Sequence, residues 1–394
     1  MKKCIALLFF LSISHFMLAG SRLSHEVSVA YSPNFFSDKR LNVLDKITFS
    51  TFSVQTLFGT KPGPESGPYE EGYNYPRFGV GFDFFGYNAM TFKDGQSYMN
   101  NAGAVYGIID LPFYRNEWFS VQFDIGLGVG VTNPAYNPVS NPLSKYAIAP
   151  VYFFNSVATS VSFSLTKQLA INAGFTLKHM STGDAEAQYA GLSSLGPVVG
   201  LSYKIDEQYR GQTRKLVLPH EFKKGLSVEI YGTYGLKIPK AELYVADLEP
   251  DPAKRQTKFT PKSRYGLGIN LPYRYCLLCS TGLAVDFNYF SDYKTMEECD
   301  RILSGKVSPG GYSPFRASIG FLQEFHYKQF SAIFGASRYL YAKTGINENQ
   351  SKWFQRLGVK AYFSSKQRSY VAFNIRSNNF SLAEYFELHL GIRI

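Results

Sequence analysis

The stretch LAINAGFTLKHMST, residues 169–182, alternates between apolar and polar side chains. The odd positions are apolar and the intervening ones largely polar: Leu169, Ile171, Ala173, Phe175 and Leu177 against Asn172, Thr176 and Lys178. Because successive side chains of a strand point to opposite faces, this pattern predicts a strand with one apolar and one polar face. His179 and Ser181 continue the apolar parity. We therefore expect a base and a hydroxyl side by side at the end of an apolar stripe.

The first residues have the pattern of a secretory signal peptide. Lys2 and Lys3 form a basic start, and an apolar run over residues 5–11 leads to small residues around position 20. The run is too short for a membrane-spanning helix. Ser21 stands where a lipoprotein would need a cysteine. We expect export, with residues 1–20 removed as a signal peptide.

The composition favours an all-β membrane protein. Aromatic residues make up 16% of the chain, with 34 Phe and 29 Tyr but 2 Trp. Beyond the signal, no stretch reaches the ~20 apolar residues of a membrane helix, and long helical patterns are absent. Alternating segments with aromatic ends are typical of transmembrane antiparallel β-barrels of the bacterial outer membrane. The alternative is a secreted β-sandwich, whose strands are shorter than these segments.

About sixteen alternating segments are predicted as strands, an even number as bacterial barrels require. They lie near 25–33, 46–56, 77–86, 103–113, 119–131, 149–166, 169–182, 192–205, 226–238, 263–275, 283–290, 313–327, 330–341, 354–364, 370–377 and 384–394. Short and long connections mostly alternate, as expected for periplasmic turns and external loops. The charged connection 206–225 is a possible domain seam. One sixteen-stranded barrel and two eight-stranded barrels both fit. We divide the chain into a barrel region at 21–205 and further barrel strands at 206–394.

The net charge is +11, which for an exported chain favours a surface facing anionic glycolipid phosphates over one that binds nucleic acid. Solvated loops and a polar barrel interior account for much of the same charge. Three cysteines remain after the signal, so at most one internal disulfide can form. Cys276 and Cys279 have a spacing found in metal sites, but no second pair follows. No metal and no cofactor are therefore expected.

The predicted topology sets the depth of His179 and Ser181. The turn at 167–168 is periplasmic, so the strand from Leu169 runs outward. His179 lies ten residues on, ~33 Å along the strand. With a tilt of about 40° this is ~25 Å of height, close to the thickness of the apolar band. Both residues are expected on the lipid face at the outer-leaflet edge, where acyl esters of lipid A lie.

A serine hydroxyl becomes a good nucleophile when a neighbouring histidine takes its proton. The plain alternative is that both residues are ordinary polar residues of the interfacial rim. His220 is a weaker candidate because it lies in a charged connection, and His326 and His389 are weaker because no same-face serine or cysteine stands two residues away on their strands. The carboxylate pairs Glu70-Glu71 and Glu297-Glu298 are interpreted as solvated loop residues.

The segment KHMSTGDAEAQYAGLSSLGPVVGLSYKI, residues 178–205, resembles the outer-membrane lipid A 3-O-deacylases (PagL-type) and their acyloxyacyl hydrolase-like relatives. The family pattern is His-x-Ser-Asn near a strand end, a short loop, a glycine, an acidic or amide residue, and a glycine-containing final strand. His179, Ser181, Gly191 and the strand at 195–205 match it. Looser similarity extends the resemblance to residues 75–205.

The resemblance implies an eight-stranded barrel that hydrolyses the ester-linked acyl chain at the 3 position of lipid A. Ser181 would be the nucleophile and His179 the base. Thr182 stands where the family has the asparagine linked to the oxyanion hole. Ser193 stands where the acidic third member would fall. The loop residues Asp184 and Glu186 are the alternatives for that role.

The leading hypothesis is an outer-membrane esterase that removes an acyl chain from lipid A or a related glycolipid. The alternatives are an outer-membrane channel or a structural barrel with a degenerate hydrolase site.

Overall fold

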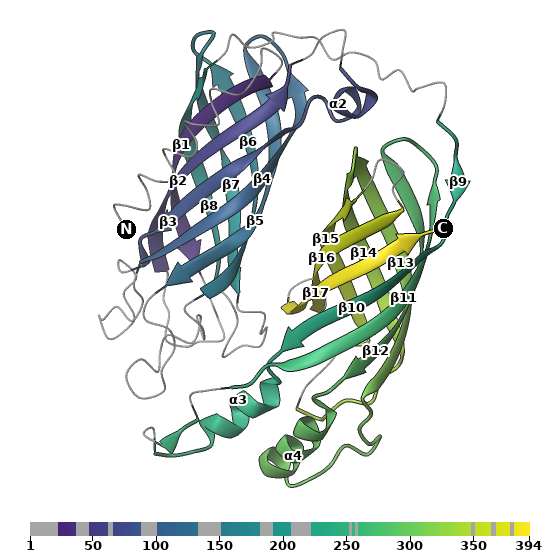
Figure 1. The fold of residues 1–394 in the computed structure, drawn as a ribbon. Coiled ribbons are helices and arrows are strands. Elements are labelled where there is room, and N and C mark those ends of the chain that lie inside the picture. The colour runs from purple at the N-terminus through teal and green to yellow at the C-terminus, as the bar shows by residue number, and fades with distance from the viewer. Residues whose placement is uncertain are drawn as a thin grey trace.

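The structure is a computed structural model. It describes residues 23–36, 47–61, 66–87, 101–132, 151–181, 192–205, 222–251, 254–256, 259–347, 351–363, 368–378 and 382–394. Most of these residues lie in antiparallel strands, which form two separate barrels (Figure 1). The fold is that of a bacterial outer-membrane β-barrel protein. Of the two topologies that fit the sequence, the chain forms two eight-stranded barrels and not one sixteen-stranded barrel.

The N-terminal barrel consists of eight strands, and β1 pairs with β8 to close it. Its strands are β1 (Leu23–Phe36), β2 (Ile47–Thr60), β3 (Arg77–Phe85), β4 (Ala102–Arg115), β5 (Phe119–Thr132), β6 (Val151–Ser164), β7 (Leu169–Ser181) and β8 (Leu192–Lys204). The predicted segments of this half match these strands to within a few residues. The alternation that predicted them therefore gives each strand one face toward the lumen and one toward the exterior.

The C-terminal barrel also has eight strands, closed by the pairing of β10 with β17. Its strands are β10 (Glu229–Lys237), β11 (Lys262–Arg274), β12 (Cys279–Phe290), β13 (Phe315–Tyr327), β14 (Phe330–Tyr341), β15 (Trp353–Tyr362), β16 (Ser369–Asn378) and β17 (Leu382–Arg393). The short strand β9 (Gly225–Leu226) pairs with the end of β11.

Within the part of the chain that the structure describes, three helices lie in connections for which the sequence predicted loops. They are α2 (Pro68–Gly72), α3 (Lys240–Asp247) and α4 (Tyr293–Ser304). In α4, Gly305 ends the helix in the left-handed conformation, with φ of 63°. The sequence segments that form the three helices are short and lie within long polar connections. Their sequence pattern therefore resembles that of loops. Within the described ranges, no helix combines the length and apolar character needed to cross a membrane.

The interpretation of Glu70 as a solvated loop residue was wrong. Glu70 belongs to α2, is 3% exposed, and forms an ion pair with Lys328 of the C-terminal barrel. The partner lies far away in the sequence, so the Glu70-Glu71 pattern alone could not indicate burial. Glu297 and Glu298 lie in α4 and not in a loop.

Both lumens are filled with side chains, as expected for eight-stranded barrels. In the N-terminal barrel, Arg77 binds Glu26 and Asp110. The C-terminal lumen contains a larger set of buried ion pairs: Lys360 with Glu229 and Glu324, Arg356 with Asp286 and Glu387, and Arg376 with Glu387. The channel alternative requires a wide aqueous lumen, such as that of a sixteen-stranded barrel. The two eight-stranded barrels do not form such a lumen.

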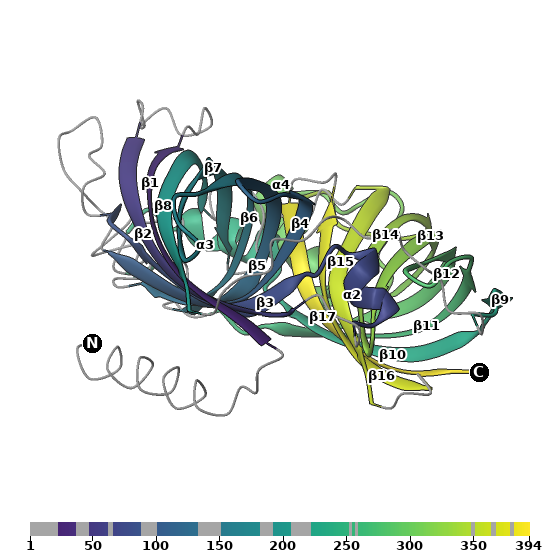
Figure 2. The ribbon, with the colours of Figure 1, turned by 90° about the horizontal axis from the view of Figure 1, so that it is seen from above.

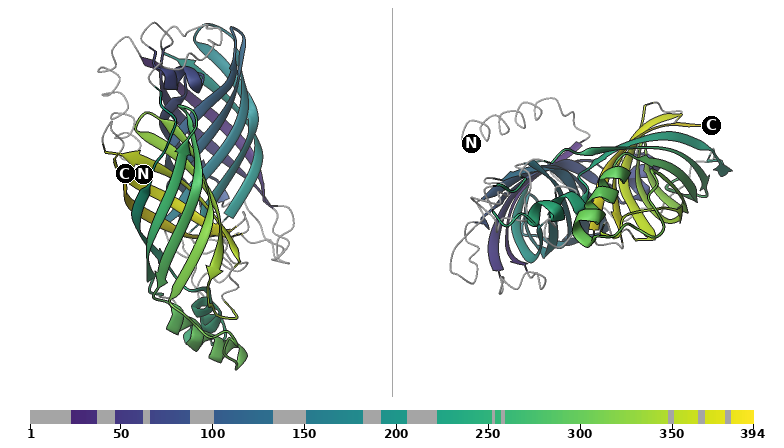
Figure 3. Two further views of the ribbon diagram at one scale, coloured as in Figure 1. Left: turned by 90° about the vertical axis from the view of Figure 1, so that its right-hand side faces the viewer. Right: turned by 90° about the horizontal axis from the view of Figure 1, so that it is seen from below.

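The two barrels lie side by side and touch near both ends of the N-terminal barrel (Figures 2 and 3). At the α2 end, the Tyr73 hydroxyl donates to the Leu278 carbonyl at 3.1 Å. The Phe78 and Tyr327 rings lie 5.0 Å apart between centroids. At the other end, Phe153 of β6 stacks against aromatic rings of β16 and β17. The barrels are thus joined by contacts as well as by the connecting segment.

Candidate active site on the outer face of the N-terminal barrel

The outward face of β7 is apolar, as the alternation predicts. Phe175 and Leu177 are 60% and 48% exposed, whereas Thr176 and Lys178 are buried in the lumen. His179 follows the outward parity and is half-buried. The histidine therefore lies on the lipid-facing surface and not in the barrel interior.

Strand register places Ser193 of β8 directly opposite His179. The Nδ1 atom of His179 and the Oγ atom of Ser193 are 2.7 Å apart, which is a hydrogen bond. Ser193 is exposed. The structure thus brings together two of the residues singled out from the sequence.

On the other side of His179, register places Asn155 of β6. Asn155 is half-buried on the outward parity of its strand, between the outward residues Phe153 and Val157. Asn155, His179 and Ser193 thus form one polar row across three strands of an otherwise apolar surface. Asn155 is not among the residues predicted from the sequence, although an amide at an outward position of an apolar strand is an available signal.

Ser181 is the last residue of β7 and shares the face of His179, two residues further on. The rise of a strand puts their backbones ~6–7 Å apart. Register places Ser181 opposite Phe153 of β6. The Ser181 side chain, together with Thr182, Asp184 and Glu186, lies outside the described residues.

The segment that carries His179 is fixed from inside the barrel on both sides of the histidine. The Lys178 ammonium forms an ion pair with Asp83 at 2.6 Å and contacts Ser53 at 3.0 Å. Met180 packs in the lumen and its Sδ atom accepts the Tyr87 hydroxyl at 3.4 Å. Such inner anchors hold the backbone still, which a catalytic geometry requires.

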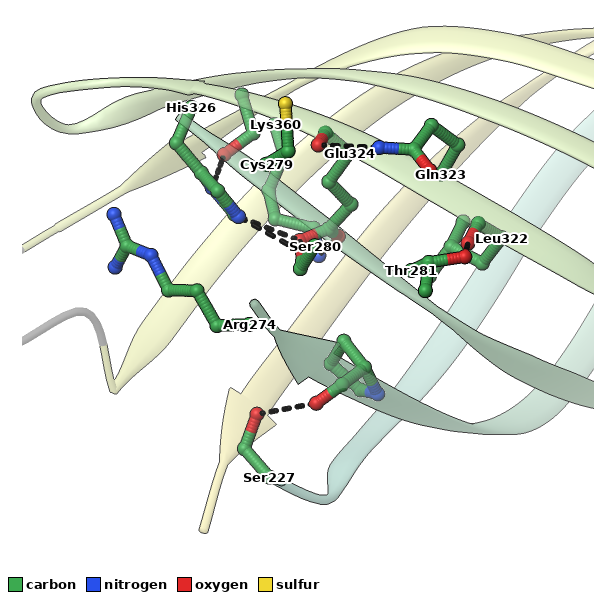
Figure 4. A network of polar contacts seen from close by, with 12 residues as sticks. Ser227, Arg274, Cys279, Ser280, Thr281, Leu322, Gln323, Glu324, His326 and Lys360 are labelled. Carbon is green, nitrogen blue, oxygen red and sulfur yellow. Dashed lines mark hydrogen bonds and ion pairs between the residues drawn. The ribbon is translucent and has the colours of Figure 1, made fainter. Parts of the chain in front are cut away.

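The second histidine with serine partners is His326, in the lumen of the C-terminal barrel (Figure 4). Its Nε2 atom lies 2.8 Å from the Ser280 Oγ, and its Nδ1 atom lies 2.8 Å from the Ser331 Oγ. The Ser280 hydroxyl also lies 3.2 Å from a Glu324 carboxylate oxygen. All four side chains are almost fully buried. Both ring nitrogens are engaged inside the ion-pair network, so this histidine joins neighbouring strands and is not presented to a lipid substrate.

His326 has no same-face serine two residues away on its own strand, and its partners Ser280 and Ser331 come from the neighbouring strands. His389 is also buried, with its Nε2 atom 3.0 Å from Glu387 and its ring stacked on Tyr231. His220 lies outside the described residues. Across the described ranges, no group of three or more His, Cys, Asp or Glu side chains could hold a metal ion. Among the described residues, Cys276, Cys279 and Cys299 form no disulfide.

The C-terminal barrel has a matching position at the outer end of its own seventh strand, β16. The segment there is Ile375-Arg376-Ser377-Asn378. It retains the Ser-Asn of the His-x-Ser-Asn pattern, but isoleucine replaces the histidine. The residue opposite Ile375 is Phe386, where the N-terminal barrel has Ser193 opposite His179. The second barrel therefore lacks a base at this position.

Comparison with known proteins gives one family. Residues 220–394, the C-terminal barrel with its preceding segment, match the family described as the C-terminal domain of acyloxyacyl hydrolase (PagL_C). No curated protein matches the chain.

Similar solved structures are β-barrel proteins with low identity. Neisserial surface protein A is 11% identical, with a TM-score of 0.31, covering 46% of this chain and 97% of its own. The toluene transporter TodX of Pseudomonas putida is 8% identical, with a TM-score of 0.17, covering 96% and 89%. OccAB1 of Acinetobacter baumannii is 11% identical, with a TM-score of 0.25, covering 95% and 96%.

Proposed function

We propose that the chain is an outer-membrane esterase, and the match of its C-terminal barrel to the acyloxyacyl hydrolase C-terminal domain family (PagL_C) supports this. The substrate is lipid A or a related glycolipid with an ester-linked acyl chain. The observation that carries the proposal is the hydrogen bond between His179 and Ser193 on the outward face of the N-terminal barrel.

The roles proposed for Ser181 and Ser193 follow from which nitrogen of the His179 ring is already hydrogen-bonded. With Nδ1–H donating to the Ser193 Oγ, the Nε2 atom is left as an acceptor for a nucleophile on the same face. Ser181, two residues further along, is the residue proposed to use it. In this arrangement Ser193 orients the ring, as the third member of a catalytic triad does. Asp184 and Glu186 then remain second choices for that task.

The chemistry is acyl transfer in two steps. His179 takes the proton of the Ser181 hydroxyl while Oγ bonds to the ester carbonyl carbon. The ester bond then breaks, and the sugar hydroxyl leaves with that proton. Water attacks the acyl-enzyme by the same route in reverse and releases the fatty acid. General-base assistance of this kind contributes about 10²–10⁴ in rate.

An oxyanion develops on the carbonyl oxygen and needs donors. We propose the Asn155 amide as one of them, because Asn155 lies beside His179 on the side opposite Ser193. Thr182, where the family has asparagine, is the second candidate. One such donor is typically worth about 10²–10³ in kcat.

The depth of the row supports a glycolipid ester as substrate. The row lies near the outer ends of β6, β7 and β8, above an apolar outward surface. The carbonyl of a lipid acyl ester lies at this boundary between head groups and acyl chains. The net charge of +11 favours the anionic phosphates of such a head group.

The test is acyl release by the purified full-length protein in vesicles that contain lipid A. Wild type is expected to liberate hydroxy fatty acid, whereas His179→Gln and Ser181→Ala lower the rate at least about a hundredfold. Ser377→Ala, the equivalent serine of the C-terminal barrel, is the matched control and should keep the wild-type rate. Full activity in Ser181→Ala would overturn the proposal.

A further inference from the structure

The hairpin that joins β11 to β12 has a cysteine on each side of its turn, Cys276 and Cys279. Their backbones exchange two hydrogen bonds around the turn residues Leu277 and Leu278, each with 3.4 Å between nitrogen and oxygen. Residues that exchange both bonds in this way have Cα atoms about 5.5 Å apart. A disulfide spans about 4.4–6.8 Å between Cα atoms. The Cys276 thiol donates to the Cys279 carbonyl at 3.9 Å, and the two side chains interact with each other.

The third described cysteine cannot reach this pair. Cys299 is buried in α4, which follows the far end of β12. Cys279 is the first residue of β12, and the 12 residues of that strand span roughly 35–40 Å. Two cysteines whose Cα atoms are more than about 7 Å apart cannot be bridged without movement of the backbone. Among the described cysteines, the fold therefore allows one pairing, Cys276 with Cys279.

The hairpin lies at the end of the C-terminal barrel that is expected to face the periplasm. The turns from β11 to β12, from β13 to β14 and from β15 to β16 are short and share this end, opposite α4 (Figure 1). Short turns are typical of the periplasmic side of an outer-membrane barrel. The bacterial periplasm is an oxidising compartment in which disulfides form and persist. Cys276 and Cys279 are half-buried, so their thiols remain partly accessible to an oxidant.

The same hairpin is where α2 of the N-terminal barrel contacts the C-terminal barrel. The Leu278 carbonyl accepts the Tyr73 hydroxyl at 3.1 Å. Arg274 donates to the Leu277 carbonyl at 2.7 Å and to the Tyr69 hydroxyl at 2.8 Å. Both carbonyls belong to the two residues between the cysteines. The conformation of this turn therefore decides whether the contacts with α2 can form.

We propose that Cys276 and Cys279 form a disulfide in the periplasm, and that this disulfide holds the hairpin in the conformation that binds α2. The structure shows the reduced pair. The inference does not depend on the proposed esterase activity, because it concerns the opposite end of the molecule and another kind of chemistry. A disulfide across the turn removes open conformations of the hairpin, in which the two carbonyls do not meet α2.

The bond forms by thiol–disulfide exchange, with the disulfide of a periplasmic protein as the oxidant. One cysteine thiolate attacks that disulfide and gives a mixed disulfide. The thiolate of the other cysteine then attacks the mixed disulfide and displaces the oxidant. The Cys276–Cys279 bond is formed and the S–S bond of the oxidant is broken. The oxidant leaves as a dithiol, which carries the two electrons and the two protons.

The first experiment looks for the bond in full-length protein from outer membranes. The protein is denatured in N-ethylmaleimide without a reductant, digested with trypsin and analysed by mass spectrometry. The tryptic peptide 275–294 contains both hairpin cysteines, and the peptide 295–301 contains Cys299. Peptide 275–294 is expected to be unalkylated and two hydrogens lighter than the dithiol, whereas peptide 295–301 is alkylated. Alkylation of both cysteines in peptide 275–294 would overturn the proposal.

The second experiment measures hydrogen exchange of α2 in the full-length protein. The amides of residues 73–75 are hydrogen-bonded at the end of this helix. Reduction of the wild type with a phosphine should speed their exchange about tenfold, because the hairpin gains conformations that do not bind α2. The double variant Cys276→Ser, Cys279→Ser should exchange at the faster rate with and without the phosphine.

Cys299→Ser is the matched control for hydrogen exchange, since it removes a cysteine that takes no part in the pair. It should respond to the phosphine as the wild type does. Equal exchange in the oxidised and the reduced wild type would overturn the role of the disulfide at the α2 contact. A phosphine response that persists in the double variant would also overturn it, because the response would then come from another group.

Discussion

His179 on β7 and Ser193 on β8 share a hydrogen bond of 2.7 Å on the outside of the N-terminal barrel. The pair is a cross-strand pair, fixed by register and not by closeness in sequence. Its location makes it accessible from the lipid and not from the lumen. A reaction at this site therefore acts on molecules of the membrane itself.

Replacement of Ser193 tests its role in orienting the ring. Ser193→Ala removes the acceptor at Nδ1 and should lower kcat about tenfold or more, because the imidazole loses its fixed orientation. Ser193→Asp should raise kcat above wild type, since a carboxylate also stabilises the imidazolium. The measurement is acyl release across a pH series. A Ser193→Ala enzyme with an unchanged rate and pH profile would show that the contact is only structural.

Replacement of Asn155 tests the oxyanion donor. Asn155→Ala should lower kcat by about 10²–10³ with little change in KM, because the amide acts on charge that develops in the transition state. Asn155→Asp should be no better, since a carboxylate repels the oxyanion. Steady-state kinetics on one ester would decide this. A raised KM with an unchanged kcat would mean that Asn155 binds the ground state and the transition state equally and is not an oxyanion donor.

The C-terminal lumen should be sensitive to loss of a single charge. Lys360 is bound by Glu229 and Glu324, and all three are buried. Lys360→Met breaks its two buried ion pairs and leaves both carboxylates paired with Arg393, and breaking a buried ion pair typically costs about 3–5 kcal/mol. The free energy of unfolding in urea, followed in lipid vesicles, is the measurement.

The control for that variant is a surface ion pair of the same barrel. Arg301 pairs with Glu297 one turn apart on α4, largely in solvent. Arg301→Ala should cost about 0.3–0.5 kcal/mol. Similar stability of Lys360→Met and Arg301→Ala would contradict the account of the lumen.

The outer end of the C-terminal barrel should loosen in acid. Burial raises the pKa of Asp300, but hydrogen bonds from the Tyr312 hydroxyl and the backbone of Ile346 and Asn347 outweigh it, and the net pKa lies below its usual value. A carboxyl with a lowered pKa stabilises the fold at neutral pH. That contribution is lost as the pH falls below about 4 and through the folded pKa.

Hydrogen exchange of the segment near Ile346 measures this loosening. Wild type should lose protection as the pH falls below about 4, whereas Asp300→Asn should exchange faster at pH 7 and show no such loss. An equal loss of protection in wild type and Asp300→Asn as the pH falls would show that another group causes the loosening.

Much of the fold could be predicted from alternation alone. All sixteen barrel strands were expected within a few residues, because the period of two is strong in strands with one lipid-facing side. The pattern could not decide between one barrel and two, since it describes each strand and not its partners. Closure depends on the pairings of β1 with β8 and β10 with β17, which join residues far apart in the chain.

The same limit applies to the site. Local spacing indicated His179 and its outward face. It did not indicate Asn155, because that residue becomes a neighbour only through register. The helices and the burial of Glu70 were missed for a similar reason: each depends on contacts with the other barrel or with distant loops. The family match falls on the C-terminal barrel, whereas the resemblance noted in the sequence lies at residues 75–205.

The central claim is that the N-terminal barrel carries an esterase site on its outer face. Mass spectrometry of lipid A, from cells that produce each protein folded in the outer membrane, tests it most directly. Wild type and Ser377→Ala should both lack one hydroxyacyl chain, whereas His179→Gln and Ser181→Ala should leave lipid A intact. Lipid A unchanged by the wild type, or loss of activity in Ser377→Ala alone, would contradict the claim.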